Sequence, residues 1–263
     1  MFLSPSEIAQ FKLDGFVIVE NLLTPGEVAQ LSRIARGDKQ LADSAYGRKD
    51  AGGAVITLSV RNELVDDAYS AIARSSRIVE RMAAFLDDEV YHYHHKLILK
   101  EPRVGGAWEW HQDYGYWYNN ACLSPDMGSC LIAIDAATPA NGCLQVLRGS
   151  HHLGRIDHGK TGDQTGADLE RVEIARQRHE LVHVELAPGS AVLFHANLLH
   201  RSDQNHSDNP RWALICCYNT RHNDPFKPGR HPNYSPLEIW DDNQLQKAMN
   251  EHEQRLQTQS RLG

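Results

Sequence analysis

Two short stretches of the chain bring together residue types that bind transition metals. One contains His111, Gln112 and Asp113 in a row, and the other carries His200. In a β-strand, residues i and i+2 point to the same side, so His111 and Asp113 can present an imidazole and a carboxylate to one point. Two histidines and one carboxylate on one face leave three coordination positions open, as in non-haem Fe(II) oxygenases. The sequence therefore predicts a metal site of His111, Asp113 and His200.

An arginine follows these stretches, and a second histidine precedes His200. Arg211 opens an apolar segment, and a strand-borne arginine beside such a site can form a bidentate pair with a carboxylate. Taken singly, a His-X-Asp, a histidine after a strand or an arginine at a strand start is usually structural or solvent-facing. Their joint order is much rarer by chance. His195 lies an odd number of residues before His200, which places it on the opposite face of a regular strand, so we expect it to be structural. Cys216 and Cys217 split between two faces for the same reason.

Strands are needed to position these residues. After residue 88, apolar and polar residues alternate with period 2, which predicts a run of strands. We predict strands at 90–100, 106–112, 129–134, 143–147, 180–185, 191–195 and 211–219. Ahead of them we predict a short helix from Ser4, a strand over 15–19, a helix capped by Thr24 and Glu27, a polar surface excursion over 37–60 and an amphipathic helical region over 63–86. Helices followed by short strands indicate an all-β sandwich or barrel with a helical flank.

Two segments lie outside this run of strands. The long polar stretch 153–178 is predicted to be a surface insertion or a lid. After Pro236, an amphipathic segment carries Leu245 and Met249, and we expect the chain to fray over 255–263.

Composition narrows the class of protein. The chain has 263 residues, a net charge of −7 and a pI near 6.1, which argue against a general binder of nucleic acids or anionic membranes. Its apolar stretches fall far short of the ~20 residues of a membrane span. Five cysteines without framework spacing, and a start without a signal-peptide pattern, favour the cytoplasm. Oligomeric state is left open.

The sequence resembles the phytanoyl-CoA dioxygenase family over nearly its whole length. The resemblance rests on short motifs spread along the chain: Phe11 with Gly15-Phe16-Val17, Lys100-Glu101-Pro102, Gly105-Gly106, His111-Gln112-Asp113, Asn141-Gly142-Cys143-Leu144, Gly149-Ser150-His151, Pro188-Gly189, Phe194-His195, the stretch from His200 to Asn205, and Arg211. It implies a mainly β fold, the double-stranded β-helix (a cupin-like jelly roll) with flanking N-terminal helices. It also implies one domain over 1–263, divided into a mostly helical flank (1–88), the jelly-roll core (89–220) and a C-terminal extension (221–263).

The resemblance assigns roles to the residues of the site. It implies that Fe(II) is bound by His111, Asp113 and His200. It further implies that Arg211 binds the far carboxylate of the cosubstrate 2-oxoglutarate and that the hydroxyl of Ser202 contacts the same carboxylate. Lys96 is expected to lie along the cosubstrate. Many members carry Trp where this chain has Leu131, so the wall of the cosubstrate pocket is expected to differ. Related halogenases have Ala or Gly at the position of Asp113, which disfavours halogenation.

The implied reaction is hydroxylation of a C–H bond of a small molecule. Of the three open metal positions, two take 2-oxoglutarate and one takes O2, and the products include succinate and CO2. Gln112 points away from the metal in a regular strand, so we interpret it as a supporting residue rather than a ligand.

Aromatic and basic residues near the triad predict the substrate class. Aromatic rings can cage a cation, at about 0.5–2 kcal/mol for each contact. Related ectoine hydroxylases carry a substrate-contacting Trp at the position of Trp117, and other members hydroxylate aminoalkylphosphonates. We therefore hypothesise a small polar zwitterion, for example an aminoalkylphosphonate or a quaternary amine. Its ammonium group would lie against Tyr114, Tyr116 and Trp117, and its anion against Lys96, Lys100 or Arg103.

Strand 90–100 has two interpretations of equal weight: a strand with one solvated face, or a basic face lining the mouth of the jelly roll. For the whole chain, the alternatives are a hydroxylase of an acyl-CoA or another lipid or secondary metabolite, a metal cupin that is not an oxygenase (an isomerase or hydrolase), and a binding module without catalysis. Arg211 and Ser202 favour the oxygenase, because a hydrolase needs no anchor for a dicarboxylate.

Overall fold

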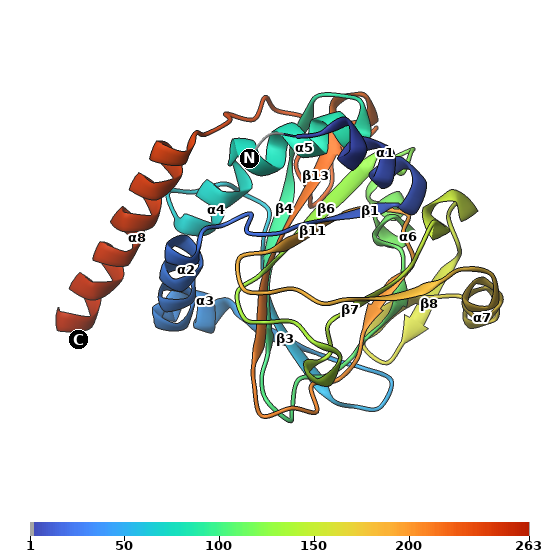
Figure 1. Ribbon diagram of the computed structural model, residues 1–263, viewed down its shortest axis with the longest axis horizontal. Coiled ribbons are helices and arrows are strands. Elements are labelled where there is room, and N and C mark those ends of the chain that lie inside the picture. The colour runs from blue at the N-terminus through green and yellow to red at the C-terminus, as the bar shows by residue number, and fades with distance from the viewer. Residues whose placement is uncertain (1–2, 263) are drawn as a thin grey trace.

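Two facing antiparallel sheets form the centre of the molecule (Figure 1). The computed structural model describes residues 3–262. The larger sheet has seven strands in the order β1 (Phe16–Val19), β11 (Ala191–His195), β6 (Met127–Ala133), β13 (Arg211–Thr220), β4 (Val90–Lys100), β3 (Val55–Arg61) and β2 (Tyr46–Lys49). The smaller sheet has four, in the order β10 (Leu181–Val184), β7 (Leu144–Leu147), β12 (His200–Ser202) and β5 (Trp108–His111). The predicted jelly roll with flanking N-terminal helices is confirmed.

A hairpin and a set of helices surround the two sheets. The hairpin pairs β8 (His158–Thr161) with β9 (Gln164–Ala167). The α-helices are α1 (Pro5–Asp14), α2 (Pro25–Gly37), α3 (Lys39–Ser44), α4 (Ala68–Ala73), α5 (Ser76–Leu86), α6 (Asp113–Trp117), α7 (Leu169–Arg178) and α8 (Asp242–Leu262). Short 3-10 turns cover η1 (Tyr118–Asn120), η2 (Pro139–Asn141), η3 (Ser150–Leu153) and η4 (Arg221–Asn223). None of the helices in the described part of the chain is long and apolar enough to cross a membrane.

Helix α2 begins where the sequence predicted. The side chain of Thr24 accepts a hydrogen bond from the backbone of Glu27, whose carboxylate accepts one from the backbone of Thr24 in return. This capping box satisfies backbone N–H groups that the first turn of a helix leaves without partners.

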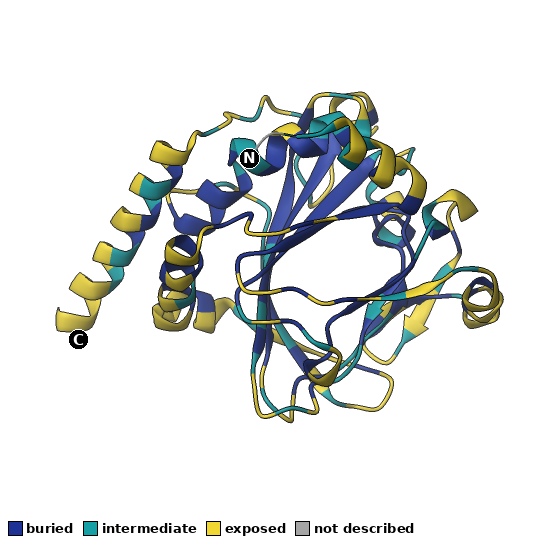
Figure 2. Cartoon of the chain, in the orientation of Figure 1, coloured by how far each residue is buried: buried dark blue, intermediate teal, exposed yellow. Residues whose placement is uncertain are grey.

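Two clusters of the hydrophobic core lie on the two faces of the larger sheet, and a third, smaller cluster includes Trp110, Leu147 and Ile156. The outer core lies between the helices and this sheet and includes Leu31, Ile72 and Met82, whereas the inner core lies between the two sheets. Figure 2 shows the strands largely buried and exposed residues along α7 and α8. Cys216 belongs to the outer core and Cys217 to the inner core, which confirms the predicted split.

Three expectations from the sequence were wrong. The polar stretch 37–60 is no surface excursion, because β2 and β3 extend the larger sheet and β3 buries Ile56 and Leu58 in the inner core. The helical region predicted over 63–86 starts only at Ala68 and is two helices, since α4 ends at Ala73 and α5 begins at Ser76. The C-terminal segment does not fray at 255, because α8 continues to Leu262.

Strand β4 has no solvated face, which corrects one of the two interpretations of that strand. Every residue of β4 is buried except Lys96, which is partly buried. The reason is its place in the fold: β4 pairs with β13 on one edge and β3 on the other, helices cover its outer face, and the smaller sheet covers its inner face.

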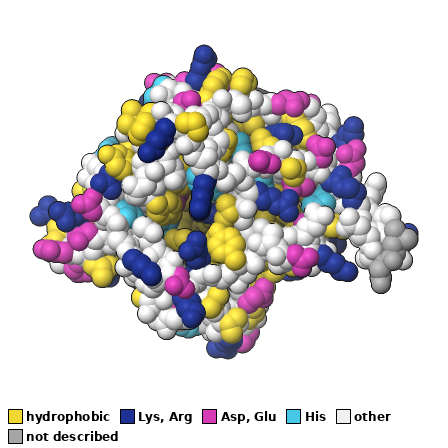
Figure 3. Space-filling model, turned by 180° about the vertical axis from the view of Figure 1, so that it is seen from behind, with side chains coloured by type: hydrophobic (Ala, Val, Ile, Leu, Met, Phe, Trp, Pro, Cys, Tyr) yellow, Lys and Arg dark blue, Asp and Glu magenta, His cyan; other side chains and the backbone are white. Residues whose placement is uncertain are grey.

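The surface carries mixed charges. Figure 3 shows Lys and Arg side chains interspersed with acidic and hydrophobic side chains over the face behind that of Figure 1. The expectations that the chain binds neither nucleic acid nor membrane stay predictions.

Candidate active site

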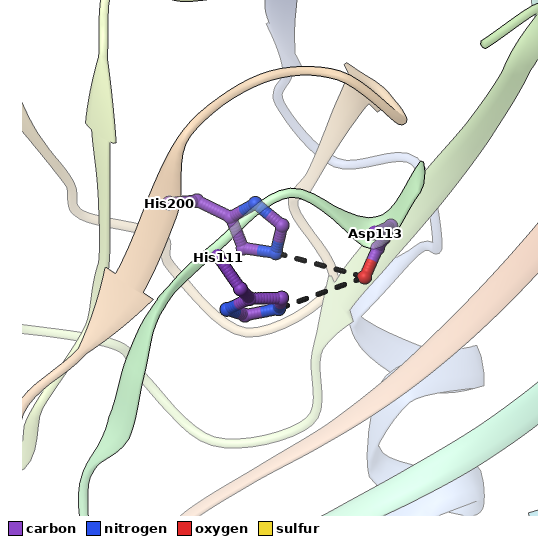
Figure 4. A group of neighbouring side chains, drawn as sticks. All are labelled: His111, Asp113 and His200. Carbon is purple, nitrogen blue, oxygen red and sulfur yellow. Dashed lines mark ion pairs between the residues drawn. The ribbon is translucent and has the colours of Figure 1, made fainter. Parts of the chain in front are cut away.

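Three predicted metal ligands meet between the ends of β5, β12 and α6 (Figure 4). His111 on β5 and His200 on β12 are directly paired in antiparallel register, so their side chains share one face. Asp113 lies just past the predicted strand 106–112 and is the first residue of α6, after an extended Gln112. That turn still aims its carboxylate at the two imidazoles.

The geometry of the triad suits one small cation. Asp113 Oδ1 lies 3.6 Å from His111 Nε2 and 3.9 Å from His200 Nε2. The three ligand atoms all lie within 4.8 Å of one another, and all three residues are buried. Two imidazole nitrogens and a carboxylate oxygen at this spacing form a donor set for a divalent transition metal.

Backbone carbonyls fix the tautomer of both histidines. Nδ1 of His111 lies 2.7 Å from the carbonyl oxygen of Glu109, and Nδ1 of His200 lies 2.9 Å from that of Leu198. Each Nδ1 therefore carries the proton and donates it, which leaves the Nε2 lone pair free to bind a metal. Burial, with a smaller effect from the neighbouring His111, lowers the pKa of His200 to about 3, so this ring is neutral at ordinary pH.

Two hydroxyl groups hold the carboxylate of Asp113. Ser129 on β6 donates to Oδ2 at 2.9 Å, and Tyr116 on α6 donates to Oδ1 at 2.8 Å. Burial by itself raises the pKa of Asp113, but the neighbouring His111 and the positive charge of Lys96 outweigh it and hold that pKa well below its usual range. Asp113 is therefore a carboxylate with a fixed orientation.

Replacing Tyr116 with phenylalanine is expected to weaken metal binding about 10- to 100-fold, the usual cost of losing a group that orients a ligand. The phenol donates to Oδ1, the oxygen that faces both histidines. Isothermal titration with a divalent metal measures the effect. Tyr114→Phe is the matched control, since its hydroxyl donates to the carbonyl of Cys122 instead. Equal affinity in both variants would contradict the role given to Tyr116.

Gln112 braces the turn that carries Asp113. Its Nε2 donates to the carbonyls of Gly154 and Asn197 at 2.8 and 2.9 Å, and its Oε1 accepts from the backbone of Ile156 at 2.7 Å. None of its polar side-chain atoms contacts the triad. This side chain therefore ties the metal-ligand turn to the segment that was predicted to be an insertion.

His158, on the same insertion, contacts that turn directly. Its Nε2 accepts a hydrogen bond from the backbone of Gln112 at 2.9 Å. Gly115 allows this approach, because a Cβ there would lie 2.0 Å from the imidazole of His158. The insertion, with β8, β9 and α7, is thus packed beside the site, and its closure as a lid stays a prediction.

One cavity joins the triad to the residues predicted to bind a cosubstrate. Besides the triad, Lys96, Leu131, Ser202 and Arg211 line it. Apolar side chains from both sheets complete most of the wall: Ile56, Ile98, Trp108, Leu144, Phe194 and Ile215, with Arg201. Leu131, which stands where many relatives carry Trp, is therefore part of this wall.

Arg211 is a buried cation without a counter-ion among residues 3–262. It is only 3% exposed, and its Nε has no hydrogen-bond partner among the described residues. Burial lowers the pKa of Arg211 to about 10, which leaves it charged at neutral pH. An uncompensated buried charge is costly, so this position favours a ligand that brings an anion.

Lys100 lies beside Arg211 and contacts Ser202. The two cations are cross-strand partners in the larger sheet, and Lys100 is fully buried. Its Nζ donates to Ser202 Oγ at 3.0 Å and to the carbonyl of Asp203. Burial, followed by the charge of Arg211, lowers the pKa of Lys100 well below its usual value. Because Lys100 donates to Ser202 Oγ, the hydroxyl hydrogen of Ser202 is left free to point at another acceptor.

The basic residues predicted to contact substrate need correction. Lys100 does not line the cavity but lies behind Ser202. Arg103 is exposed and pairs with Asp208 at 2.8 Å, because it lies in the loop after β4 rather than on the inner face of the strand. Neither lines the cavity of the triad, and contact of either with a substrate stays a prediction.

The aromatic residues predicted to contact substrate also lie off the cavity wall. Tyr114 is buried in the inner core, Tyr116 contacts Asp113, and Trp117 packs with its ring centroid 5.6 Å from that of His94. The cause is α6, whose helical turn points these side chains in different directions instead of along one strand face.

Sequence reasoning missed several residues of the site. Ser129 holds Asp113, His158 holds the turn, and Ile56, Trp108 and Arg201 line the cavity. A signal existed for Ser129, a polar residue inside an otherwise apolar strand. His195 behaves as expected, since its Nδ1 accepts from the backbone of Asn197 and it stays outside the triad.

Comparisons with known proteins agree with this geometry. The profile of the phytanoyl-CoA dioxygenase family matches residues 11–213. The chain is 27% identical over 236 residues to the L-proline trans-4-hydroxylase of Streptomyces griseoviridis, covering 83% of this chain and 87% of that enzyme. It is 28% identical over 248 residues to the ectoine dioxygenase of Nocardia farcinica, covering 87% and 83%.

Solved structures share the fold. The EctD protein of S. alaskensis, crystallised with 2-oxoglutarate and 5-hydroxyectoine, superposes with a TM-score of 0.77 at 24% identity and covers 91% of this chain and 88% of that one. A second crystal structure of the same protein, with bound Fe, gives a TM-score of 0.76 at 23% identity, with the same coverage.

Proposed function

The chain belongs to the phytanoyl-CoA dioxygenase family, and from this premise we propose that it hydroxylates a C–H bond of a small, polar, zwitterionic substrate with Fe(II), 2-oxoglutarate and O2. It is an enzyme of the Fe(II)- and 2-oxoglutarate-dependent dioxygenase class. The observation that carries the proposal is one cavity lined both by the triad and by the uncompensated Arg211.

The donor set fits Fe(II). His111, Asp113 and His200 would hold the metal, and all three line the cavity, where the remaining coordination positions would be available to ligands. When bound, Fe(II) with 2-oxoglutarate and O2 supplies an oxidant that replaces a C–H hydrogen with hydroxyl, while 2-oxoglutarate leaves as succinate and CO2. Ser129 and Tyr116 keep the carboxylate of Asp113 in place throughout.

The cavity also fits a dicarboxylate. The guanidinium of Arg211 can pair with the far carboxylate in bidentate fashion, and the hydroxyl of Ser202 can donate to the same group. Lys96 lines the cavity and is proposed to lie along the cosubstrate. The apolar wall excludes water, which strengthens these charge interactions.

Replacing Lys100 with methionine is expected to weaken 2-oxoglutarate binding about 10-fold, since Ser202 loses its orienting donor. Metal binding should not change, because Lys100 contacts no triad residue. Anaerobic titration of the Fe(II)-loaded protein with 2-oxoglutarate measures both. Lys160→Met, at an exposed position on β8, is the control. Unaltered affinity in Lys100→Met would show that Ser202 needs no such support.

The substrate class rests on the relatives and on the cavity. The L-proline hydroxylase and the ectoine dioxygenases are named for small polar substrates. The basic residues at the cavity, Lys96 and Arg201, suit a substrate that carries an anion. We therefore keep a small zwitterion, such as an aminoalkylphosphonate, an amino acid or a quaternary amine, as the proposed substrate.

Succinate release tests the substrate class. Purified protein with Fe(II), 2-oxoglutarate, ascorbate and O2 is screened against aminoalkylphosphonates, quaternary amines, amino acids and acyl-CoAs. The proposal expects stimulation by a small zwitterion and a product heavier by one oxygen atom. Stimulation by acyl-CoAs alone would contradict the zwitterion and support the lipid alternative. No turnover with any class, in protein that binds iron, would favour the isomerase or hydrolase.

A further inference from the structure

We propose that the hairpin of β8 and β9 positions two of the three metal ligands, with His158 acting on Asp113 and Gln164 acting on His111. Seating of this hairpin and binding of the metal are then coupled, so that each strengthens the other. This inference rests on the proposed function, since it concerns the same metal site. It assigns positioning residues for the metal and does not depend on which substrate the enzyme takes.

Strand β5, which carries His111, is an edge strand of the smaller sheet. Its backbone pairs with β12 on one side, while β9 lies along its free edge and belongs to a separate two-stranded sheet with β8. The free edge of a strand presents backbone N–H and C=O groups that need partners. On this edge, a side chain of the hairpin supplies hydrogen bonds that a neighbouring strand would otherwise make.

Gln164 on β9 is that side chain. Its Oε1 accepts a hydrogen bond from the backbone of Glu109 at 3.0 Å, and its Nε2 donates to the carbonyl of Ala107 at 2.9 Å. Gln164 is only 3% exposed, so these bonds are shielded from water. The carbonyl of Glu109 in turn accepts the Nδ1 proton of His111 at 2.7 Å. Gln164 therefore fixes the residue whose carbonyl orients the imidazole of His111.

His158 on β8 holds the turn that carries Asp113. Its Nδ1 donates to the carbonyl of Ile156 at 2.8 Å, which leaves Nε2 as an acceptor for the backbone N–H of Gln112 at 2.9 Å. Gln112 lies between two metal ligands and precedes the first residue of α6, where no side chain caps the helix. The imidazole of His158 thus satisfies a backbone donor in the middle of the metal-ligand turn.

Asp113 lies between two anchored backbone N–H groups. The N–H of Gln112, on one side, donates to His158, and the N–H of Tyr114, on the other, donates to the carbonyl of Ala196 at 2.9 Å. The second anchor comes from the segment between β11 and β12, which leads to the third metal ligand. The first anchor comes only from the hairpin, so the direction of the Asp113 carboxylate depends on the hairpin being in place.

The helix α6 has room for His158 because of a glycine. A Cβ on Gly115 would lie 2.0 to 2.2 Å from three atoms of the imidazole. The φ of Gly115 is not positive, so the backbone alone does not require glycine at this position. Glycine is therefore needed here for the close approach of His158, and alanine would displace the imidazole.

The far end of the hairpin is anchored to the larger sheet. The backbone of Asp163 donates to the carbonyl of Lys49 on β2 at 3.1 Å, and Arg48 donates to the carbonyl of Asp163 at 3.3 Å. The hairpin thus spans from β2 to β5 and holds its side chains against the metal-ligand segment. Opening of the hairpin would break the bonds of His158 and Gln164 to that segment together.

Metal binding and hydrogen exchange test this coupling without relying on turnover. Anaerobic titration gives the affinity for Fe(II), and the visible absorption of the Co(II)-loaded protein reports the geometry around the metal. Hydrogen exchange over 158–167, with and without metal, reports the opening of the hairpin. Thermal unfolding of the metal-free protein shows which variants fold.

The variants separate the hydrogen bonds from packing. His158→Leu and Gln164→Leu remove the bonds, whereas His158→Gln keeps an acceptor near the position of Nε2. Gly115→Ala displaces the imidazole and leaves both hydrogen-bonding residues in the chain. Lys160→Leu, at an exposed position on β8, is the matched control.

His158→Leu, Gln164→Leu and Gly115→Ala should each weaken Fe(II) binding about 10- to 100-fold and change the Co(II) spectrum, as expected when a group that orients a metal ligand is lost. His158→Gln should recover most of the affinity, and Lys160→Leu should match wild type. In wild type, metal should slow exchange of the hairpin, and in the two leucine variants it should slow it less, because the coupling is reciprocal.

Wild-type Fe(II) affinity and an unchanged Co(II) spectrum in the folded leucine variants would overturn the inference. If those variants do not fold, the same result in Gly115→Ala would overturn it. Hairpin exchange that metal does not slow in wild type would also overturn it, and binding by His158→Gln as weak as by His158→Leu would overturn the role of the His158 hydrogen bond. Wild type that binds no divalent metal would instead overturn the proposed function, and the inference with it.

Discussion

Arg211→Ala is expected to raise the dissociation constant for 2-oxoglutarate about 100-fold or more, because it removes one partner of a buried charge pair. Arg211 is 3% exposed, and its guanidinium has no counter-ion in the described part of the chain, so the far carboxylate of the cosubstrate is the partner that we propose for it. Iron should remain bound, since Arg211 contacts none of His111, Asp113 and His200. Anaerobic titration with 2-oxoglutarate, together with the metal content, measures both quantities.

Arg103→Ala is the matched control for this prediction. Arg103 is exposed and pairs with Asp208 away from the cavity, so its loss should leave cosubstrate affinity as it was. Arg211→Lys should recover only part of the affinity, because an ammonium cannot make the bidentate pair. Full affinity for 2-oxoglutarate in Arg211→Ala would show that Arg211 does not bind the far carboxylate of the cosubstrate.

Loss of a group that only orients a metal ligand lowers metal affinity by up to roughly 100-fold. His200→Ala removes a ligand itself, so it should lower Fe(II) affinity by more than that. Two ligands remain, and the Nε2 lone pair that the carbonyl of Leu198 directs at the centre is gone. Substrate-stimulated succinate release should fall to background. Iron content after anaerobic loading and desalting gives the first quantity, and product analysis gives the second.

His183→Ala, at an exposed position on β10, is the control for a change of histidine without loss of a ligand. A His200→Ala protein that retains one tightly bound iron would contradict the triad.

The metal ligands were predictable because two of them lie close together in the sequence and all three are residue types that bind transition metals. His111 and Asp113 lie two residues apart, and His200 follows a strand, so the sequence restricts where their side chains can meet. The helix α6, which begins at Asp113 directly after the strand, was not predicted. The prediction survived because the extended Gln112 still separates the two ligands by one residue.

Strand β3 was not predictable from its own residues. Its burial depends on pairing with β4, a contact between segments that a local pattern does not contain. The same limit explains β4, whose histidines and lysines read as a solvated face but are covered by elements from both ends of the chain. Tertiary packing decides burial where polarity alone indicates exposure.

Side chains that act through other side chains were the hardest to find. Lys100 appeared to be a substrate contact but directs Ser202, and Tyr116 appeared to belong to a cation cage but holds Asp113. Gln164 lies in an insertion without any motif, so only the structure brings it to β5.

The most direct test of the account is succinate formation by protein reconstituted with Fe(II), in the presence of 2-oxoglutarate, O2 and the zwitterion that stimulates turnover most, beside the same assay with His111→Ala. We expect succinate and hydroxylated product in equal amounts, dependent on added Fe(II) and absent from the variant. Product formed without Fe(II), or equal turnover by His111→Ala, would contradict it.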